Sequence, residues 1–210
     1  MSDKSSAMYR WRKWSARDRQ IVLNERRQRH HPWHSPPHIA SDSTSLYLIT
    51  AACFEHKPVI GSTDARIAGF CETLLSTVST RTASIYAWVV LPNHYHLLLN
   101  APDLKELISG IGQMHGRLSF QWNTEDQLRG KRQVWCRCSE TAMKSEGHFM
   151  ATINYVHHNP VRHGYCEKWT QWPYSSARDY LADVGYEVAR RRWKQYPLYD
   201  YGADWDPVDL

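Results

Sequence analysis

The stretch SIYAWVVLPNHYHLLLN, residues 84–100, decides the fold class of this 210-residue chain. Residues 84–91 are rich in the β-branched and aromatic side chains that are typical of a strand. Pro92 and Asn93 interrupt this apolar run, and residues 94–100 resume it. Because Pro and Asn favour a turn between two such runs, the stretch predicts a β-hairpin.

Two helices and one more strand are predicted around this hairpin. Residues 46–54 (LYLITAACF) have the composition of a strand, and residues 63–80 carry apolar side chains at helical spacing. After the hairpin, Asp103 and Glu106 form a capping pattern in front of a long apolar stripe. The pattern therefore predicts a strand and a helix before the hairpin, and a long helix after it.

The last predicted elements complete the order strand, helix, strand, strand, helix, strand, helix. Residues 133–139 (QVWCRCS) predict a fourth strand, after a polar loop at residues 124–132. Residues 145–159 predict a third helix with Ser145 as N-cap, which Pro160 should stop or bend. This order predicts an α+β fold, with one antiparallel sheet of the ferredoxin-like kind covered by helices.

Composition divides the chain into three parts. Residues 1–44 form a basic helical extension followed by a Pro/His-rich connector, residues 45–182 form the α+β domain, and residues 183–210 form a C-terminal tail. The chain carries a net charge of +5, yet residues 1–30 alone hold nine Lys or Arg against three acidic residues. Such a segment indicates a polyanionic partner, and nucleic acid is the first candidate. A basic helix that is merely solvated fits the same charge pattern equally well. The candidate DNA-binding residues are Arg12, Lys13, Arg17, Arg26, Arg27, Lys131 and Arg132.

Cysteine usage and hydropathy predict an intracellular protein. The five cysteines are odd in number and match no disulfide scaffold, so we expect reduced thiols in a cytoplasm. No apolar run is long enough to span a membrane, and the N-terminus lacks the apolar core of a signal peptide. We therefore expect a soluble cytoplasmic protein with no membrane partner.

His94 and His96 are the first candidate site residues. Residues i and i+2 of a strand point to the same face of the sheet, so both imidazoles can reach one metal ion. Two histidines on a solvated strand face fit the same spacing. The pair on its own is therefore a weak signal.

Tyr155 and Asn159 are the second candidate pair. They lie four residues apart in FMATINYVHHNPVRHGY and share one face of the predicted helix. Its apolar side should pack on the sheet and leave this pair near the sheet's edge. A positioned tyrosine can act as a nucleophile in phosphoryl transfer, but an interfacial tyrosine beside a helix-capping asparagine fits equally.

Together the two segments resemble a known family. YAWVVLPNHYHLLLN resembles the HUH motif of single-tyrosine transposases, and INYVHHNPVRHGY resembles their nucleophile helix. The flanking WPYSSARDY and YLITAACFEHKPVIG are similar to REP-associated tyrosine transposases, which are relatives of small insertion-sequence transposases. The resemblance spans about residues 45–182 and consists of two separate motifs in the family's order.

The resemblance implies a role for each of four residues. His94 and His96 match the paired histidine ligands, Asn159 matches the third ligand, and Tyr155 matches the nucleophile. Tyr95 stands where the family has an aliphatic residue, and we expect its bulk to face the core. The ion would be Mg²⁺ or Mn²⁺, because imidazole and amide oxygen donors with open positions suit ions that also bind phosphate oxygens.

The implied activity is cleavage and rejoining of single-stranded DNA through a 5′-phosphotyrosine. The implied substrates are REP-like palindromes that fold into hairpins in bacterial nucleoid DNA, bound by a monomer or a homodimer. Trp11, Trp14 and Trp33 could stack on unpaired bases, whereas Trp88 and Trp135 are expected in the core. The alternatives are a catalytically silent nucleic-acid-binding regulator on the same fold, and a replication-initiator-type nickase.

Three further histidines lie near Tyr155 in the sequence. His157 and His158 point away from its face at helical spacing and are expected mainly as polar surface. His148 lies two turns before Tyr155 on a similar face and is a weaker candidate for proton transfer.

Overall fold

The computed structural model describes residues 45–199, 201, 202 and 206, which all belong to one compact unit spanning residues 40–210. The predicted basic extension and its connector lie outside the described residues. The strands are β1 (Leu46–Ala52), β2 (Ser84–Val90), β3 (His94–Asn100) and β4 (Ser139–Ala142). The helices are α3 (Asp64–Ser79), α4 (Leu104–Glu125), α5 (Glu146–Arg162), α6 (Ala177–Val184) and α7 (Tyr186–Gln195), with 3₁₀ turns η1 (Phe54–His56) and η2 (Ile60–Ser62).

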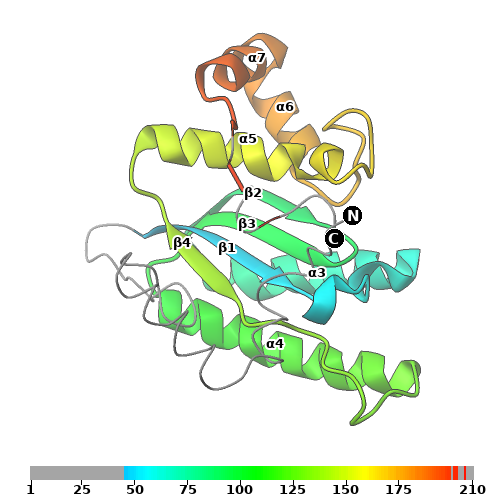
Figure 1. Ribbon diagram of the computed structural model, residues 1–210. Coiled ribbons are helices and arrows are strands. Elements are labelled where there is room, and N and C mark those ends of the chain that lie inside the picture. Colours follow the sequence, from blue (N-terminus) through cyan, green and yellow to red (C-terminus); the bar gives the residue numbers. More distant parts are fainter. Residues whose placement is uncertain (1–44, 200, 203–205, 207–210) are drawn as a thin grey trace, which may run out of the picture. The chain divides into compact units, whose positions relative to one another are not determined.

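The four strands form one antiparallel sheet in the order β2-β3-β1-β4. Helices α3 and α4 lie on one side of the sheet, and α5 lies on the other side with α6 and α7 beyond it (Figure 1). The predicted α+β fold is confirmed. The β2–β3 hairpin is confirmed as well, and the expected caps are present. Asp103 Oδ1 accepts from the Glu106 amide at 2.9 Å, and Ser145 Oγ accepts from the His148 amide at 3.1 Å.

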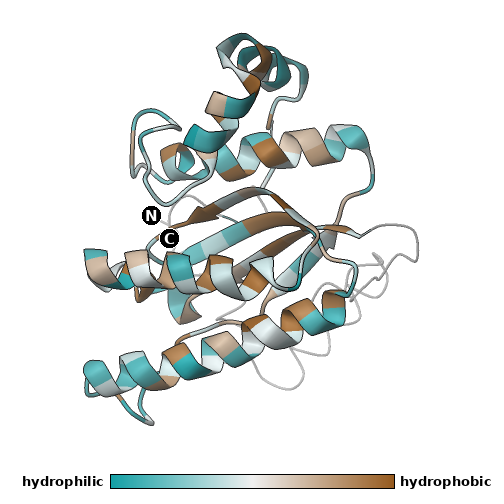
Figure 2. Cartoon of the chain, turned by 180° about the vertical axis from the view of Figure 1, so that it is seen from behind, coloured by the Kyte–Doolittle hydropathy of each residue, from teal (hydrophilic) through white to brown (hydrophobic). Residues whose placement is uncertain are grey.

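Both faces of the sheet are buried, so the fold contains two apolar cores. Tyr95, Leu97 and Leu99 of β3 belong to the core under α3 and α4, whereas Leu98 belongs to the core under α5. Figure 2 shows helices that alternate hydrophobic and hydrophilic residues around a sheet with long hydrophobic stretches. Because side chains alternate along a strand, the residues between the apolar ones in the first core must face α5. His94 and His96 are two of these residues.

The predicted fourth strand at residues 133–139 is wrong in position. The strand that pairs with β1 starts at Ser139, which opposes Thr50, and residue 135 only forms an isolated bridge with Cys53. Trp135 instead packs in the core, where its ring stacks on His115 at 3.9 Å and contacts Phe70 at 5.4 Å. Its expected place in the core is confirmed. The β-prone side chains of this stretch thus serve burial rather than strand pairing.

Helix α5 continues two residues beyond the predicted stop at Pro160. The bonds at the end of the helix include those from the His163 amide to the Asn159 carbonyl at 3.0 Å and from the Tyr165 amide to the Pro160 carbonyl at 2.9 Å. These bonds close the last turn although proline itself donates none. Asn159 therefore lies inside the helix and does not cap it.

The WPYSS segment that follows α5 covers the free edge of β2. The Val90 amide donates to the Tyr174 carbonyl at 2.9 Å, and the Ser176 amide donates to the Trp88 carbonyl at 3.0 Å. The Trp172 indole donates to the Val90 carbonyl at 2.8 Å. An exposed strand edge invites pairing with other chains, and this segment blocks it.

The described helices include none that is long and apolar enough to cross a bilayer. All five cysteines are free thiols, as the sequence predicts.

Candidate active site

His94 and His96 both lie on the face of β3 that α5 covers. Their rings are 5.0 Å apart, and the two side chains are almost completely buried. Tyr95 between them points to the opposite core, where its hydroxyl lies 3.1 Å from His115 Nε2. Its bulk therefore faces the core, as expected, and leaves the site to the two imidazoles.

A neighbouring polar group holds the Nδ1 atom of each imidazole. His94 Nδ1 lies 2.8 Å from Asn93 Oδ1, and His96 Nδ1 lies 2.8 Å from Thr50 Oγ1 on β1. Both Nε2 atoms are thereby turned toward α5. Burial lowers the pKa of His94 to about 3, so its imidazole is neutral at physiological pH. A neutral imidazole, oriented through its other nitrogen, is the form that binds metals.

Tyr155 and Asn159 of α5 each contact one of these two histidines. The Tyr155 hydroxyl lies 3.2 Å from His96 Nε2, and Asn159 Oδ1 lies 3.1 Å from His94 Nε2. All four residues singled out from the sequence therefore converge in space. Both side chains of the α5 pair have no exposed surface, and α5 packs on β2, an edge strand of the sheet, and on β3. Asp206 lies against both of these side chains.

Asp206, like His163, is a site residue that the sequence did not reveal. Its carboxylate accepts a short hydrogen bond from the Tyr155 hydroxyl and a 2.8 Å bond from Asn159 Nδ2. The same carboxylate lies 3.1 Å from His163 Nε2, 3.6 Å from His94 Nε2 and 3.8 Å from His96 Nε2. No periodicity or spacing links an aspartate in the last residues of the chain to a strand and a helix far before it.

Asp206 is ionised in this arrangement and Tyr155 is not. Burial alone would raise the pKa of the Asp206 carboxyl, but hydrogen bonds from His163 and His96 outweigh burial and hold that pKa well below its usual range. Burial and the adjacent Asp206 carboxylate raise the pKa of Tyr155 well above its usual value. The phenol is therefore protonated and donates to the carboxylate.

Tyr201 and Gly202 pack on the same tyrosine. The Tyr201 ring lies 5.0 Å from the Tyr155 ring, and its hydroxyl bonds to Thr152 Oγ1 at 2.5 Å and lies 3.2 Å from His148 Nε2. Gly202 has a φ of +86°, and a Cβ there would lie 2.7 Å from Tyr155 Cε2. His148 thus contacts Tyr201, and Tyr201 packs on Tyr155.

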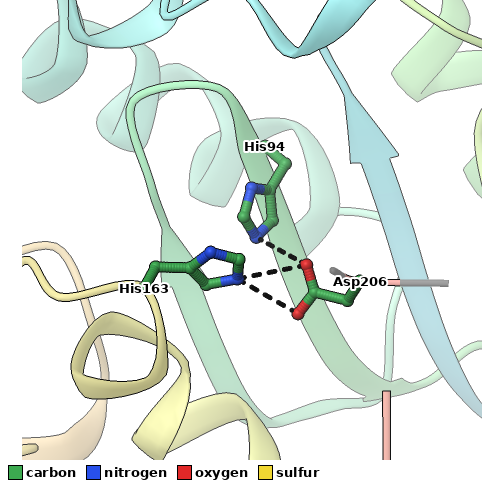
Figure 3. A group of neighbouring side chains, drawn as sticks. All are labelled: His94, His163 and Asp206. Atoms are coloured by element: carbon green, nitrogen blue, oxygen red, sulfur yellow. Dashed lines mark hydrogen bonds and ion pairs between the residues drawn. The ribbon is translucent and has the colours of Figure 1, made fainter. Parts of the chain in front are cut away.

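The site offers donors that suit a divalent cation. Nε2 of His94, Nε2 of His163 and a carboxylate oxygen of Asp206 lie within 4.8 Å of one another and could hold a metal ion (Figure 3). His96 Nε2 and Asn159 Oδ1 adjoin this group, so it overlaps the set matched from the sequence. Imidazole nitrogens mixed with carboxylate and amide oxygens fit a borderline or hard ion such as Mn²⁺ or Mg²⁺.

The remaining candidates lie apart from this site or outside the described residues. His157 is buried, with its Nε2 2.9 Å from Ser176 Oγ, so its expected place on the surface is wrong. Arg132 forms internal bonds to Asp126 at 2.7 Å and to Asn123 at 2.8 Å, whereas Lys131 is exposed. The basic residues Arg12, Lys13, Arg17, Arg26 and Arg27 and the tryptophans Trp11, Trp14 and Trp33 lie outside the described residues.

Comparison with known proteins finds sequence relatives and a solved structure of similar fold, whereas no family model matches the chain. A putative REP-associated tyrosine transposase of Haemophilus influenzae is 27% identical over 117 residues, which are 51% of this chain and 65% of the relative. A REP-associated tyrosine transposase of Escherichia coli is 28% identical over 97 residues, 46% of this chain and 55% of the relative. The chain thus spans less than two thirds of the length of either curated relative.

The solved structure is that of a REP-associated tyrosine transposase bound to a REP hairpin. It matches with a TM-score of 0.53 and 21% identity, over 68% of this chain and 82% of that chain. At this identity the match establishes the fold. In sequence and in fold, the chain therefore resembles the REP-associated tyrosine transposases.

Proposed function

We propose that this chain is a metal-dependent single-tyrosine transposase that cleaves and rejoins single-stranded DNA beside REP-like hairpins. The observation that carries the proposal is the meeting of Tyr155 with His96 at 3.2 Å and of Asn159 with His94 at 3.1 Å. A phenol beside a cluster of imidazole and amide donors suits phosphoryl transfer. The sequence relatives are named as REP-associated tyrosine transposases, and the solved neighbour is bound to a REP hairpin.

In the proposed reaction, the Tyr155 oxygen attacks the phosphorus of a phosphodiester. A bond forms between this oxygen and phosphorus, and the bond from phosphorus to the 3′-oxygen breaks. The phenolic proton leaves Tyr155, and the departing 3′-oxygen takes up a proton, so the reaction releases no net proton. The products are a 5′-phosphotyrosine and a free 3′-hydroxyl. The tyrosyl ester retains the bond energy, so a 3′-hydroxyl can reverse the step without a nucleotide cofactor.

His94, His96 and Asn159 would hold Mg²⁺ or Mn²⁺ in this proposal. When bound, the ion supplies neutralisation of phosphate charge and polarisation of the scissile bond. Asn93 and Thr50 orient the two imidazoles, each through Nδ1 at 2.8 Å. This second layer of hydrogen bonds fixes the donors before DNA arrives.

Asp206 must move before DNA reaches Tyr155. The Tyr155 side chain has no exposed surface, and the Asp206 carboxylate occupies the space beside its hydroxyl. A phosphate and a carboxylate carry the same sign of charge and cannot share that space without a large electrostatic cost. The described arrangement is therefore the DNA-free state of the proposed enzyme.

A labelled hairpin with single-stranded flanks tests the proposal, incubated with the full chain and Mn²⁺ or Mg²⁺. We expect cleavage in the flank that EDTA abolishes and added Mn²⁺ restores. His94→Ala should lower cleavage by at least roughly 100-fold, as expected for a lost metal ligand, while circular dichroism shows a retained fold. Hairpin binding without cleavage in either metal would reject the enzyme and favour the silent regulator.

A further inference from the structure

Helix α5 contributes to a cavity that the proposed chemistry does not use. Its volume is about 320 Å³, within the usual range for small-molecule sites. It lies among α5, α6 and α7 and the loop before α6 (Figure 1). The lining residues are Asn154, His157, His158, Trp169, Tyr180, Tyr186, Ala189, Arg190 and Trp193.

Flat rings dominate this lining, since six of these nine side chains are aromatic or imidazole. His158 lies 4.9 Å from the Trp193 ring, and His157 lies 4.8 Å from the Tyr180 ring. Tyr186 and Trp193 keep 66% and 41% of their surface exposed, so the cavity is open on the α7 side. Large apolar rings left open to solvent on a polar helix indicate a binding surface.

The helix beside the cavity is strongly basic. Arg190, Arg191 and Lys194 are exposed on α7, and Glu187 is its one acidic residue. No ion pair is recorded for these three cations among the described residues. A fourth cation, Arg192, is used internally, because it donates to the Tyr180 hydroxyl at 3.2 Å. The rim therefore offers free positive charge next to stacking surfaces.

Helix α5 carries residues of both the cavity and the candidate active site. Asn154 Nδ2 donates to the carbonyls of Tyr196 at 2.9 Å and Arg192 at 3.3 Å, which ties the end of α7 to α5. Asn154 is the residue before Tyr155, so α5 presents its nucleophile on one side and the cavity on another. The two sites are separated by about one helix diameter, roughly 10 Å.

We propose that this cavity binds one unpaired base of single-stranded DNA while Arg190, Arg191 and Lys194 contact its phosphates. Aromatic rings that stack a base beside cations that follow the backbone are how proteins hold single strands. Duplex DNA does not fit, because its bases are paired within the helix. The inference rests on the proposed function and names a site where the single-stranded flank of the substrate is held.

Abasic scanning of a hairpin flank tests the proposal with the full chain. One abasic nucleotide is moved through the flank, and affinity is measured by fluorescence anisotropy with EDTA present. In the wild type we expect one position whose abasic substitution weakens binding roughly 5- to 100-fold, as for one lost stacking contact. In Trp193→Ala the intact DNA should bind about as weakly, and the abasic penalty should disappear.

Three further variants test whether the loss of affinity comes from the missing ring and not from a disturbed fold. Trp193→Phe keeps a stacking ring and should retain most of the affinity, whereas Tyr186→Ala removes an exposed ring with little effect on the fold. Phe120→Ala, at a side chain 59% exposed on α4, should change nothing. If the loss of affinity caused by the abasic nucleotide persists in Trp193→Ala and Tyr186→Ala, the cavity does not bind a base. The cavity would then be a binding site for a protein segment.

The same data separate the two proposals. If the wild type binds and cleaves the hairpin but no flank position depends on Trp193, only the base site is overturned. If the wild type binds no DNA, both proposals fail.

Discussion

At the scale of single residues, the candidate site depends on side chains that orient other side chains. Thr50 Oγ1 lies 2.8 Å from His96 Nδ1 across the β1–β3 pairing, where the two residues oppose each other. Thr50→Val keeps the shape and removes this partner. We expect the Mn²⁺ concentration for half-maximal cleavage to rise about 10- to 100-fold, with cleavage restored at saturating Mn²⁺.

Thr141→Val on β4 is the matched control, because Thr141 is exposed and opposes Leu48 outside the site. Equal Mn²⁺ dependence in both variants would show that Thr50 does not position His96.

Asp206 gives the second prediction at this scale. Asp206→Ala removes a charged hydrogen bond to Tyr155, a contact worth about 1.5–3 kcal/mol. Because the carboxylate stands where a phosphate must bind, we expect cleavage to rise at least roughly tenfold at saturating metal. Single-turnover cleavage rates measure the change. A fall in rate, with a weaker dependence on Mn²⁺, would make Asp206 a required ligand or base instead.

Spacing predicted that the members of each pair share a face, and the family resemblance implied that the two pairs meet. Two histidines two apart share a strand face, and a tyrosine and an asparagine four apart share a helix face. Asp206 and His163 could not be predicted, because their place depends on how the chain after α5 returns across the sheet. Their contacts join residues separated by more than 40 positions.

At the scale of elements, α3 and α4 are joined by a charged network at their ends. Arg66 bonds to both carboxylate oxygens of Asp126 at 2.7 and 2.9 Å, and Arg132 bonds to the same carboxylate at 2.7 Å. Hydrogen bonds from Arg66 and then Arg132 outweigh burial and lower the pKa of Asp126 to about 2. The network therefore joins two helices that cover the same face of the sheet.

Arg66→Ala should lower the free energy of unfolding by about 1–3 kcal/mol, between the ranges for exposed and buried ion pairs. The pKa of Asp126 is depressed on folding, so its contribution is present above about pH 4 and is lost as the pH falls toward 2. Urea unfolding at several pH values should show that the difference in the free energy of unfolding between Arg66→Ala and the wild type becomes smaller over that pH range. Arg117→Ala, at an exposed arginine of α4, should show no difference at any pH.

The types of the elements from β1 to α5 followed from sequence pattern, whereas helices α6 and α7 and two boundaries did not. The β-prone residues 133–139 look like a strand locally, but Trp135 is drawn into the core by Phe70, His115 and Trp122. Pro160 looks like a stop, but bonds beyond it close the last turn. In both cases tertiary contacts overrule a local preference.

At the scale of the whole molecule, the charge of residues 1–30 predicts how the chain binds DNA. These residues hold nine Lys or Arg. Each cation that neutralises a phosphate releases counterions, so a deletion of residues 1–30 should weaken hairpin binding and flatten its salt dependence. Affinity measured at several salt concentrations gives the slope. An unaltered slope would show that this segment does not contact DNA, and the domain boundary predicted near residue 45 would lose its functional meaning.

The central claim is that Tyr155 is the nucleophile of a metal-dependent DNA cleavage. The direct measurement is a denaturing gel of the chain incubated with 5′- and 3′-labelled hairpin DNA and Mn²⁺, followed by mass spectrometry of the shifted band. The account predicts a covalent adduct on Tyr155 that carries the 5′-phosphate side, and its complete loss in Tyr155→Phe with hairpin binding retained. An adduct that persists in Tyr155→Phe, or one that maps to another residue, would contradict the account.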